Sequence, residues 1–184
     1  PALIRSQALQ NRRRVDFLLA TKIVGVLCPV AREVGIVTQT RWKLTIEYKG
    51  TNYCGWQRQA DGVPSIQQAV EEALYGFCQQ RLTLHVAGRT DAGVHACGQV
   101  AHFDLDYGDR PLDGFDLAKA LNAHLRHHTV SITDAVPVLP DFHARFHAKN
   151  KLYRYRIINR SAPPALESGL AWHVKKPLDW QTMH

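Results

Sequence analysis

The sequence predicts an α+β fold in which helices cover one face of an antiparallel sheet. Two patterns carry this prediction. Hydrophobic residues alternate with polar ones over residues 42–48, as they do in a half-buried strand. Farther along, apolar residues recur at helical spacing over residues 66–77, which indicates an amphipathic helix. Four further segments continue these two periods as far as residue 138.

The first strand and the first helix have the clearest signals. The strand, residues 41–50, reads RWKLTIEYKG and places four apolar side chains on one face: Trp42, Leu44, Ile46 and Tyr48. After a loop, Ser65 begins the helix, because a serine followed three residues later by Gln68 matches a capping box. The apolar stripe of this helix consists of Ile66, Ala69, Val70, Ala73, Leu74 and Phe77. Such a one-sided stripe predicts packing against a sheet.

The remaining elements complete a known order. RLTLHVAG (81–88) and GQVAHFDLD (98–106) are predicted strands on either side of a glycine-flanked loop. FDLAKALNAHL (115–125) is a predicted helix, and TVSITDAVPV (129–138) is a fourth strand. The order β-α-β-β-α-β is the ferredoxin-like arrangement, an antiparallel sheet with its helices on one face. The other face of the sheet is expected to be free to bind a ligand.

A further strand is expected over residues 142–157, because apolar and polar residues alternate there as well. In a strand, His143 and His147 would lie roughly 13 Å apart and could not bind one ion. His95 and Cys97 stand one residue apart and have no evident second pair of ligands. We therefore expect no metal site.

Charge is unevenly distributed along the chain. The formal net charge is +7, and residues 141–160 hold six basic residues against one acidic residue. A basic segment interleaved with aromatic residues favours a polyanionic partner, although a solvated surface remains the alternative interpretation. The four cysteines form no CxxC pair, so neither a zinc ribbon nor a disulfide scaffold is indicated. Free thiols suit the cytosol, and a cytoplasmic location is expected.

Residues 1–40 are interpreted as an N-terminal extension of unknown role. Their basic start and apolar middle resemble a signal sequence only loosely. Lys22 interrupts the apolar run, no A-x-A site follows, and the run is too short to span a bilayer. We expect no membrane association. The chain is divided into this extension and an α/β domain over residues 41–184, a size that one domain of ordinary length can reach.

The loop between the second and third predicted strands holds an isolated carboxylate. In AGRTDAGVHA (87–96), Asp91 stands between glycines and two residues after Arg89. Two other segments could act with it: YCGWQRQ (53–59) and the Tyr/Arg run YRYRI (153–157). Each also has a purely structural interpretation. The aspartate could form an Asx-turn or a helix cap, the Tyr/Arg run could be cross-strand packing, and the tryptophan could belong to the core.

The combination favours chemistry on a nucleic acid. Arginine suits phosphate contacts, and a tyrosine ring can stack on an unpaired base. No second acid stands near Asp91, which disfavours a glycosidase pair. Neither a G-x-S-x-G elbow nor a phosphate-binding glycine motif is present. A reaction without a cofactor, with Asp91 as nucleophile, fits best. The alternative is a non-catalytic RNA-binding module, which would not need this acid and lacks the aromatic signature of such modules.

Five segments resemble, in the same order, those of the tRNA pseudouridine synthase A family. AGRTDAGVHA resembles its catalytic motif, and the others are YCGWQRQ, PSIQQAVEEAL (64–74), FHARF (142–146) and YRYRI. The resemblance covers about residues 41–184. It implies the first half of a pseudouridine synthase fold and the isomerisation of uridines in the tRNA anticodon stem-loop. It further implies a homodimer that uses neither a cofactor nor a metal.

The resemblance also implies roles for individual residues. Asp91 would be the aspartate that attacks the uridine, and Arg89 would pair with Asp91 and hold the base out of its helix. Tyr153 would stack on the target base and assist proton transfer. The other expected substrate-binding residues are Trp56, Gln57, Arg58, Arg145 and Arg154.

Two features depart from the family pattern. Arg126 stands where the family usually has proline, which affects the expected shape of that loop. The sequence also ends at His184, before the second half of similar fold that the resemblance implies. That half would complete the sheet and the catalytic cleft. We therefore expect residues 1–184 alone to be inactive.

Overall fold

The computed structural model describes residues 14–17, 39–60 and 62–183. These residues fall into two compact units. The larger unit ends at Lys151 and contains the described residues from 39 onward, and the smaller unit contains residues 14–17 and 152–183. Most of the predicted extension, residues 1–40, lies outside the described residues.

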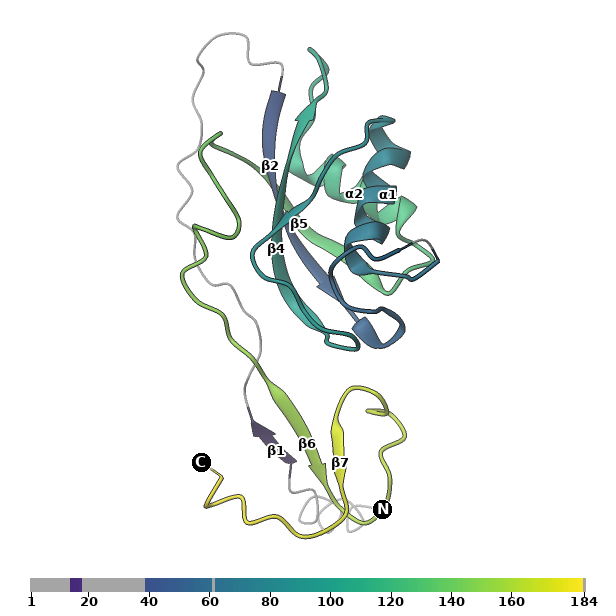
Figure 1. The fold of residues 1–184 in the computed structure, drawn as a ribbon, viewed down its shortest axis with the longest axis vertical. Coiled ribbons are helices and arrows are strands. Elements are labelled where there is room, and N and C mark those ends of the chain that lie inside the picture. Colours follow the sequence, from purple (N-terminus) through teal and green to yellow (C-terminus); the bar gives the residue numbers. More distant parts are fainter. Residues whose placement is uncertain (1–13, 18–38, 61, 184) are drawn as a thin grey trace, which may run out of the picture. The chain divides into compact units, whose positions relative to one another are not determined.

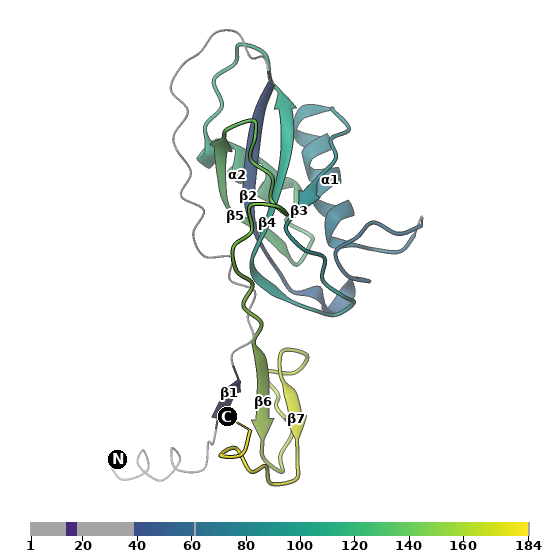
Figure 2. The ribbon, with the colours of Figure 1, turned by 60° about the vertical axis from the view of Figure 1, so that its left-hand side comes forward.

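The larger unit has the predicted ferredoxin-like arrangement. Its four-stranded antiparallel sheet has the order β3-β4-β2-β5. The strands are β2 (Gln39–Tyr48), β3 (His85–Val86), β4 (Ala96–Asp106) and β5 (Val130–Val138). The helices α1 (Ile66–Cys78) and α2 (Gly114–His124) cover one face of this sheet (Figures 1 and 2). A short 3-10 helix, η1 (Gly50–Asn52), follows β2. The predicted fold class is confirmed.

Side chains fix the start of each helix. The Ser65 hydroxyl accepts a hydrogen bond from the Gln68 backbone N–H at 3.2 Å, as the capping pattern predicts. The Asp113 carboxylate accepts from the Asp116 N–H at 2.8 Å and caps α2 in the same way. After α1, Gln79 adopts a left-handed conformation with φ 58°, which ends the helix.

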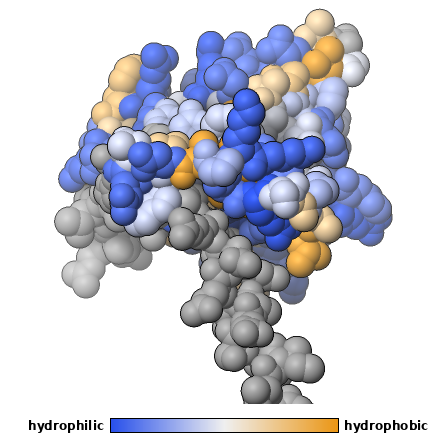
Figure 3. All heavy atoms as spheres, turned by 90° about the horizontal axis from the view of Figure 1, so that it is seen from below, coloured by the Kyte–Doolittle hydropathy of each residue, from blue (hydrophilic) through white to orange (hydrophobic). Residues whose placement is uncertain are grey.

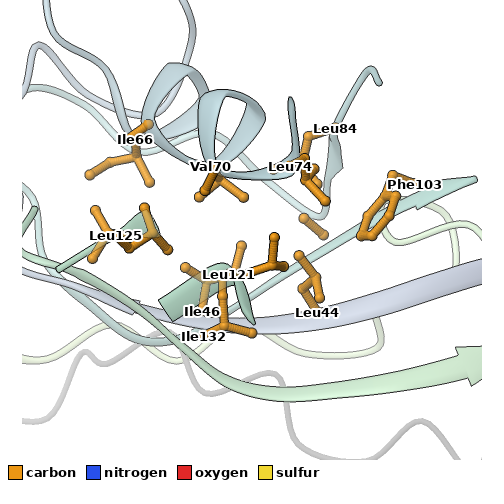
Figure 4. Close-up of a cluster of buried hydrophobic side chains, with 14 of the residues drawn as sticks. Leu44, Ile46, Ile66, Val70, Leu74, Leu84, Phe103, Leu121, Leu125 and Ile132 are labelled. Atoms are coloured by element: carbon orange, nitrogen blue, oxygen red, sulfur yellow. The ribbon is translucent and has the colours of Figure 1, made fainter. Parts of the chain in front are cut away.

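The hydrophobic core lies between the helices and the sheet (Figure 4). The four apolar residues predicted on one face of the first strand are all at most 3% exposed. The stripe of α1 is buried from Ile66 to Leu74, and Phe77 packs at its margin. From α2, Leu117 and Leu121 complete the layer, and Leu125 follows at the end of the helix. Burial of this apolar surface is the main source of stability for the unit.

Two predicted strands differ from the structure. Of residues 81–88, only His85 and Val86 pair with β4. The segment 142–149 is not a strand: residues 144–146 form a turn, and the His147 N–H donates to the His143 carbonyl at 2.9 Å. The alternation that suggested a strand matches burial only at its start, because Phe146, the next apolar residue of the pattern, is 75% exposed. Phe142 and Ala144 are buried, whereas Arg145 and Phe146 are exposed.

Residues 139–151 form a segment, here called the strap, on the side of the sheet opposite the helices (Figure 1). Phe142 and Ala144 of the strap pack in a second buried cluster with Ala87, Val100 and Val138. The face that the sequence analysis expected to be free is therefore partly covered. The reason is that this face presents apolar side chains of β4 and β5, which the strap shields from water.

Polar contacts also hold the strap. The Arg41 guanidinium donates to the Phe142 carbonyl at 2.9 Å and to the Pro140 carbonyl. The Ala144 N–H donates to Nδ1 of His102 at 3.2 Å. His102 is 2% exposed, and burial, with smaller contributions from nearby cationic groups, lowers its pKa to about 4. The neutral ring that results can accept the bond from the strap.

The smaller unit contains a three-stranded sheet. Its strands are β1 (Arg14–Phe17), β6 (Tyr155–Asn159) and β7 (Trp172–Val174). β1 pairs with β6 antiparallel, and β6 pairs with β7 parallel. The Asn159 amide donates to the carbonyls of Val174 and Lys176 and connects β6 to the segment after β7. Large apolar side chains remain exposed in this unit, among them Tyr155, Leu166 and Trp172.

Hydrophilic residues predominate on the face shown in Figure 3, and the apolar residues on it lie in small separate groups. Within the described ranges, neither α1 nor α2 nor any other helix is long and apolar enough to cross a bilayer.

Candidate active site

Asp91 lies in a tight turn between β3 and β4. The Val94 N–H donates to the Asp91 carbonyl at 3.2 Å, and Gly93 inside this turn has a φ of +78°. An L-residue rarely adopts that conformation, so the turn requires glycine there. The Asp91 side chain is exposed, and no hydrogen bond or ion pair connects its carboxylate to the described residues. The carboxylate is therefore neither an Asx-turn nor a helix cap.

A second loop holds the Asp91 turn in place. The Trp56 N–H donates to the Thr90 carbonyl at 2.9 Å, and the Gly93 N–H donates to the Tyr53 carbonyl at 3.3 Å. Gly55, with a φ of +110°, lies between these bonds. A Cβ atom there would lie 2.6 Å from the Thr90 carbonyl oxygen. Glycine at this position thus lets the two loops touch backbone to backbone.

Buried polar side chains support the loop from the sheet. The Tyr48 hydroxyl lies 2.9 Å from the Thr90 hydroxyl. The Gln99 amide donates to the Gly88 carbonyl at 2.7 Å and to the Tyr48 hydroxyl at 3.4 Å. Burial raises the pKa of Tyr48, and its bonds to Thr90 and Gln99 oppose that shift. The loop is therefore bonded at Gly88, Thr90 and Gly93, and Asp91 lies between these fixed points.

Arg89 is exposed on the same loop but does not pair with Asp91 in this structure. Within the part of the chain that the structure describes, no ion pair of 4.0 Å or less joins the two side chains. Both groups point into solvent from a backbone that is held rigidly. The pairing that the sequence analysis expected remains a prediction.

The loop over residues 53–59 separates its three predicted substrate-binding residues. Trp56 is 1% exposed and packs in the core beside Tyr48, with ring centroids 6.1 Å apart. Its side chain is buried in the core and anchors the loop there. Gln57 and Arg58 are exposed. Nε of Arg58 lies 3.4 Å from a carboxylate oxygen of Glu71 on α1, so this arginine already has an acidic neighbour.

The remaining predicted site residues lie on two different units. Arg145 is exposed in the turn of the strap, within the unit that carries Asp91. Tyr153 and Arg154 belong to the smaller unit, directly before β6, and both are exposed. The structure therefore brings Asp91, Arg89, Gln57 and Arg58 onto neighbouring loops of one unit and places the tyrosine on the other.

Contrary to the prediction from alternation, His143 and His147 are not separated along a strand. These residues lie in one turn, where the His143 N–H donates to Nδ1 of His147 at 3.3 Å. The His143 ring also neighbours the rings of His85 and His102, with centroids 6.0 and 4.7 Å away. Even so, among the described residues no three His, Cys, Asp or Glu side chains are arranged to hold a metal ion.

Sequence reasoning missed the residues that support the loop. Tyr48 was expected in the core, but alternation does not reveal the partner of its hydroxyl. Gln99 did carry a signal, because it shares the core face of a strand with Ala101 and Phe103 and is polar. A buried amide at such a position requires hydrogen-bond partners, and a loop backbone supplies one of them.

Comparison with known proteins places these loops in a family. The sequence profile of a family described as tRNA pseudouridine synthase matches residues 44–147. The tRNA pseudouridine synthase A of Rhodospirillum centenum is 53% identical over 144 residues, 78% of this chain and 57% of the relative. That of Rhodospirillum rubrum is 52% identical over 139 residues, 76% of this chain and 49% of the relative.

A third relative agrees with these two. The tRNA pseudouridine synthase A of Wolbachia pipientis is 46% identical over 143 residues, 78% of this chain and 57% of the relative. The chain spans about half the length of the curated relatives that it matches. Because the family profile matches more than half of its residues, with the Asp91 loop inside the matched range, the chain belongs to the tRNA pseudouridine synthase family.

Proposed function

We propose that this chain carries the nucleophile of a tRNA pseudouridine synthase and that Asp91 is that nucleophile. The observation that carries the proposal is the state of its carboxylate, which is exposed and unbonded to the described residues on a loop fixed from two sides. A structural aspartate would use its oxygens in local hydrogen bonds. A reactive one needs a rigid backbone and oxygens left for the substrate.

The proposed reaction needs only the Asp91 carboxylate and proton transfer at C5 and N1 of the uracil. The Asp91 carboxylate attacks the target uridine, at ribose C1′ or at the base. The N1–C1′ bond breaks, the uracil turns, and C5 bonds to C1′. C5 then loses its proton, N1 gains one, and the carboxylate is released. Substrate and product are isomers, so the reaction consumes no oxidant, reductant or co-substrate, and no cofactor or metal is proposed.

The other site residues bind and orient the substrate in this proposal. Arg89 pairs with Asp91 when RNA is bound and holds the flipped nucleotide out of its helix. Tyr153 stacks on the uracil and assists removal of the C5 proton. Gln57 and Arg58 grip the RNA from the neighbouring loop, and Arg58 exchanges Glu71 for a phosphate. Trp56 acts only by fixing that loop.

The substrate is proposed to be the anticodon stem-loop of tRNA, bound by a homodimer in the cytoplasm. The relatives named tRNA pseudouridine synthase A support the tRNA substrate. Exposed arginines on both units, Arg145 and Arg154, supply cations for the phosphate backbone. A membrane is not part of this proposal.

Tritium release from tRNA labelled at C5 of uridine tests the proposal directly. The enzyme would join this chain to the part of the Rhodospirillum centenum relative that the match does not cover. Asp91→Asn should abolish release and leave tRNA affinity within about twofold, because only the covalent step is lost. Asp109→Asn, a change in another exposed loop, should leave both unchanged. Turnover by Asp91→Asn at the wild-type rate would overturn the assignment of Asp91 as nucleophile. No release by the joined wild-type protein, with tRNA binding retained, would favour a non-catalytic RNA-binding module.

A further inference from the structure

Gly88, directly before Arg89, lies under the side chain of Lys151. A Cβ atom built at Gly88 would lie 3.9 Å from Cδ of Lys151, 3.0 Å from Cε, and closer still to the Nζ atom. Gly88 is not among the glycines with a positive φ, so its backbone does not require glycine. What the absent side chain provides is room for the lysine.

Both sides of this contact are held by the fold. The Gly88 carbonyl accepts the 2.7 Å hydrogen bond from Gln99, which is itself 1% exposed. On the other side, the strap is packed against the sheet through Phe142 and Ala144, and Ala148 lies at the margin of the same cluster. Lys151 follows Ala148 by three residues. The packing of the strap therefore brings Lys151 beside the Asp91 loop.

The charge of Lys151 is not neutralised by a neighbour. Its side chain is exposed, and within the ranges that the structure describes it forms no ion pair of 4.0 Å or less with a carboxylate. The nearby Asp91, three residues beyond Gly88, likewise makes no such pair. A cation that the fold brings beside an exposed carboxylate has a use when an anionic ligand lies across both.

We propose that Lys151 binds a backbone phosphate of the RNA beside the nucleotide that Asp91 attacks, and that Gly88 provides the space for this contact. This inference rests on the proposed function. Lysine suits the role because its ammonium is a compact point charge that accepts a phosphate from several directions. The contact fixes the register of the RNA on the loop and carries no sequence information.

The salt dependence of RNA binding by residues 1–184 tests the inference, with a synthetic tRNA anticodon stem-loop as the probe. Lys151→Ala should flatten the slope of log K against log salt by about 0.7–0.9, the loss of one phosphate contact. Lys151→Arg should restore the slope. Lys119→Ala on α2 removes the same charge from an exposed site on the helical side of the sheet and should leave the slope unchanged.

Gly88→Ala tests the position of the Lys151 ammonium without removing its charge. The new methyl group would displace the flexible end of Lys151 at little cost to the fold, because the atoms that it meets can move. It should weaken binding as Lys151→Ala does, although the net charge is unchanged. Equal slopes for Lys151→Ala and Lys119→Ala, or wild-type affinity in Gly88→Ala, would overturn the inference. If the wild-type chain showed no salt-dependent binding, the proposed function itself would fail instead.

Discussion

Arg41 and Asp104 face each other on neighbouring strands and form a two-pronged ion pair. Nε and Nη2 of the arginine lie 2.6 and 2.7 Å from the two carboxylate oxygens. The same guanidinium donates through Nη1 to the carbonyls of Pro140 and Phe142. The pair lowers the pKa of Asp104, chiefly through its hydrogen bonds to Arg41. One side chain thus connects the sheet to the strap that carries Lys151.

Replacing Arg41 should release the start of the strap. Arg41→Ala removes bonds to a carboxylate and to two carbonyls and should cost about 1–3 kcal/mol in the free energy of unfolding. Arg41→Lys keeps the positive charge but cannot donate to both carboxylate oxygens in the same two-pronged geometry, so it should lower the free energy of unfolding by less. Thermal unfolding measures the loss, and hydrogen exchange at the Ala144 amide measures the release. An Ala144 amide as protected in Arg41→Ala as in the wild type would show that packing alone holds the strap.

The buried His102 should make stability depend on pH. Its folded pKa, about 4, lies below the value of 6.5 that the unfolded chain has. The unfolded state therefore binds more protons between these values, and stability rises with pH across them. The stability that neutral His102 contributes is fully present above about pH 6.5 and is lost as the pH falls toward 4. The lowered pKa of His102 corresponds to a change of roughly 3 kcal/mol at most in the free energy of unfolding.

Denaturant unfolding between pH 7 and pH 4 measures this slope. The groups facing His102 are His85 and His143, whose rings lie 5.0 and 4.7 Å away, and the Arg41–Asp104 pair. His102→Asn retains an acceptor for the Ala144 N–H but does not titrate, so the slope should become shallower. His127→Asn, at an exposed position, is the matched control. An unchanged slope in His102→Asn would assign the dependence to other groups.

Contact between the two loops of the site can be tested at Gly55. Gly55→Ala adds a Cβ atom 2.6 Å from the Thr90 carbonyl oxygen on a backbone with positive φ. Backbone strain and steric overlap together should lower the free energy of unfolding by about 2–4 kcal/mol. Gly108→Ala has a φ of +62° and open space around the added atom, so it should show only the conformational cost, about 1 kcal/mol.

Hydrogen exchange gives the local readout of the same pair of variants. The Trp56 amide should lose protection in Gly55→Ala, since its bond to Thr90 crosses the disturbed contact, and should keep it in Gly108→Ala. If both variants lost equal stability and kept the Trp56 amide protected, the structure of the two loops would not depend on their close approach at Gly55.

Periodicity predicted the larger unit because its core is built from regular faces. The alternation of β2 and the stripe of α1 each correspond to one buried surface, and the caps at Ser65 and Asp113 are local in sequence. The strap could not be predicted in this way. Alternation in the sequence does not distinguish a strand from a turn that lies on a sheet. The bonds from Arg41 and His102 that hold this turn connect residues far apart in sequence.

The sequence indicated candidate residues for the site but not the contacts that support them. A lone carboxylate among glycines identified Asp91, and the structure shows that the carboxylate is exposed. The roles of Gly55 and Gly88 could not be read from the sequence, because each depends on a neighbour that folding brings close, Thr90 in one case and Lys151 in the other. The burial of Trp56 was an open alternative that only the packing of its ring could decide.

The last prediction concerns residues 1–184 on their own. They should bind anticodon stem-loop RNA weakly, with a steep salt dependence, and should release no tritium from tRNA labelled at C5 of uridine. Binding needs only exposed cations, which this chain has. Isomerisation needs the uridine to be enclosed and held against Asp91, and the matched relatives carry a large further part of chain that could complete the enclosure. Joining that part from the Rhodospirillum centenum relative should restore release, and the Asp91→Asn form of the joined protein should not show it. Release by residues 1–184 at the rate of the joined protein would show that the loops around Asp91, with Tyr153, already form a complete site.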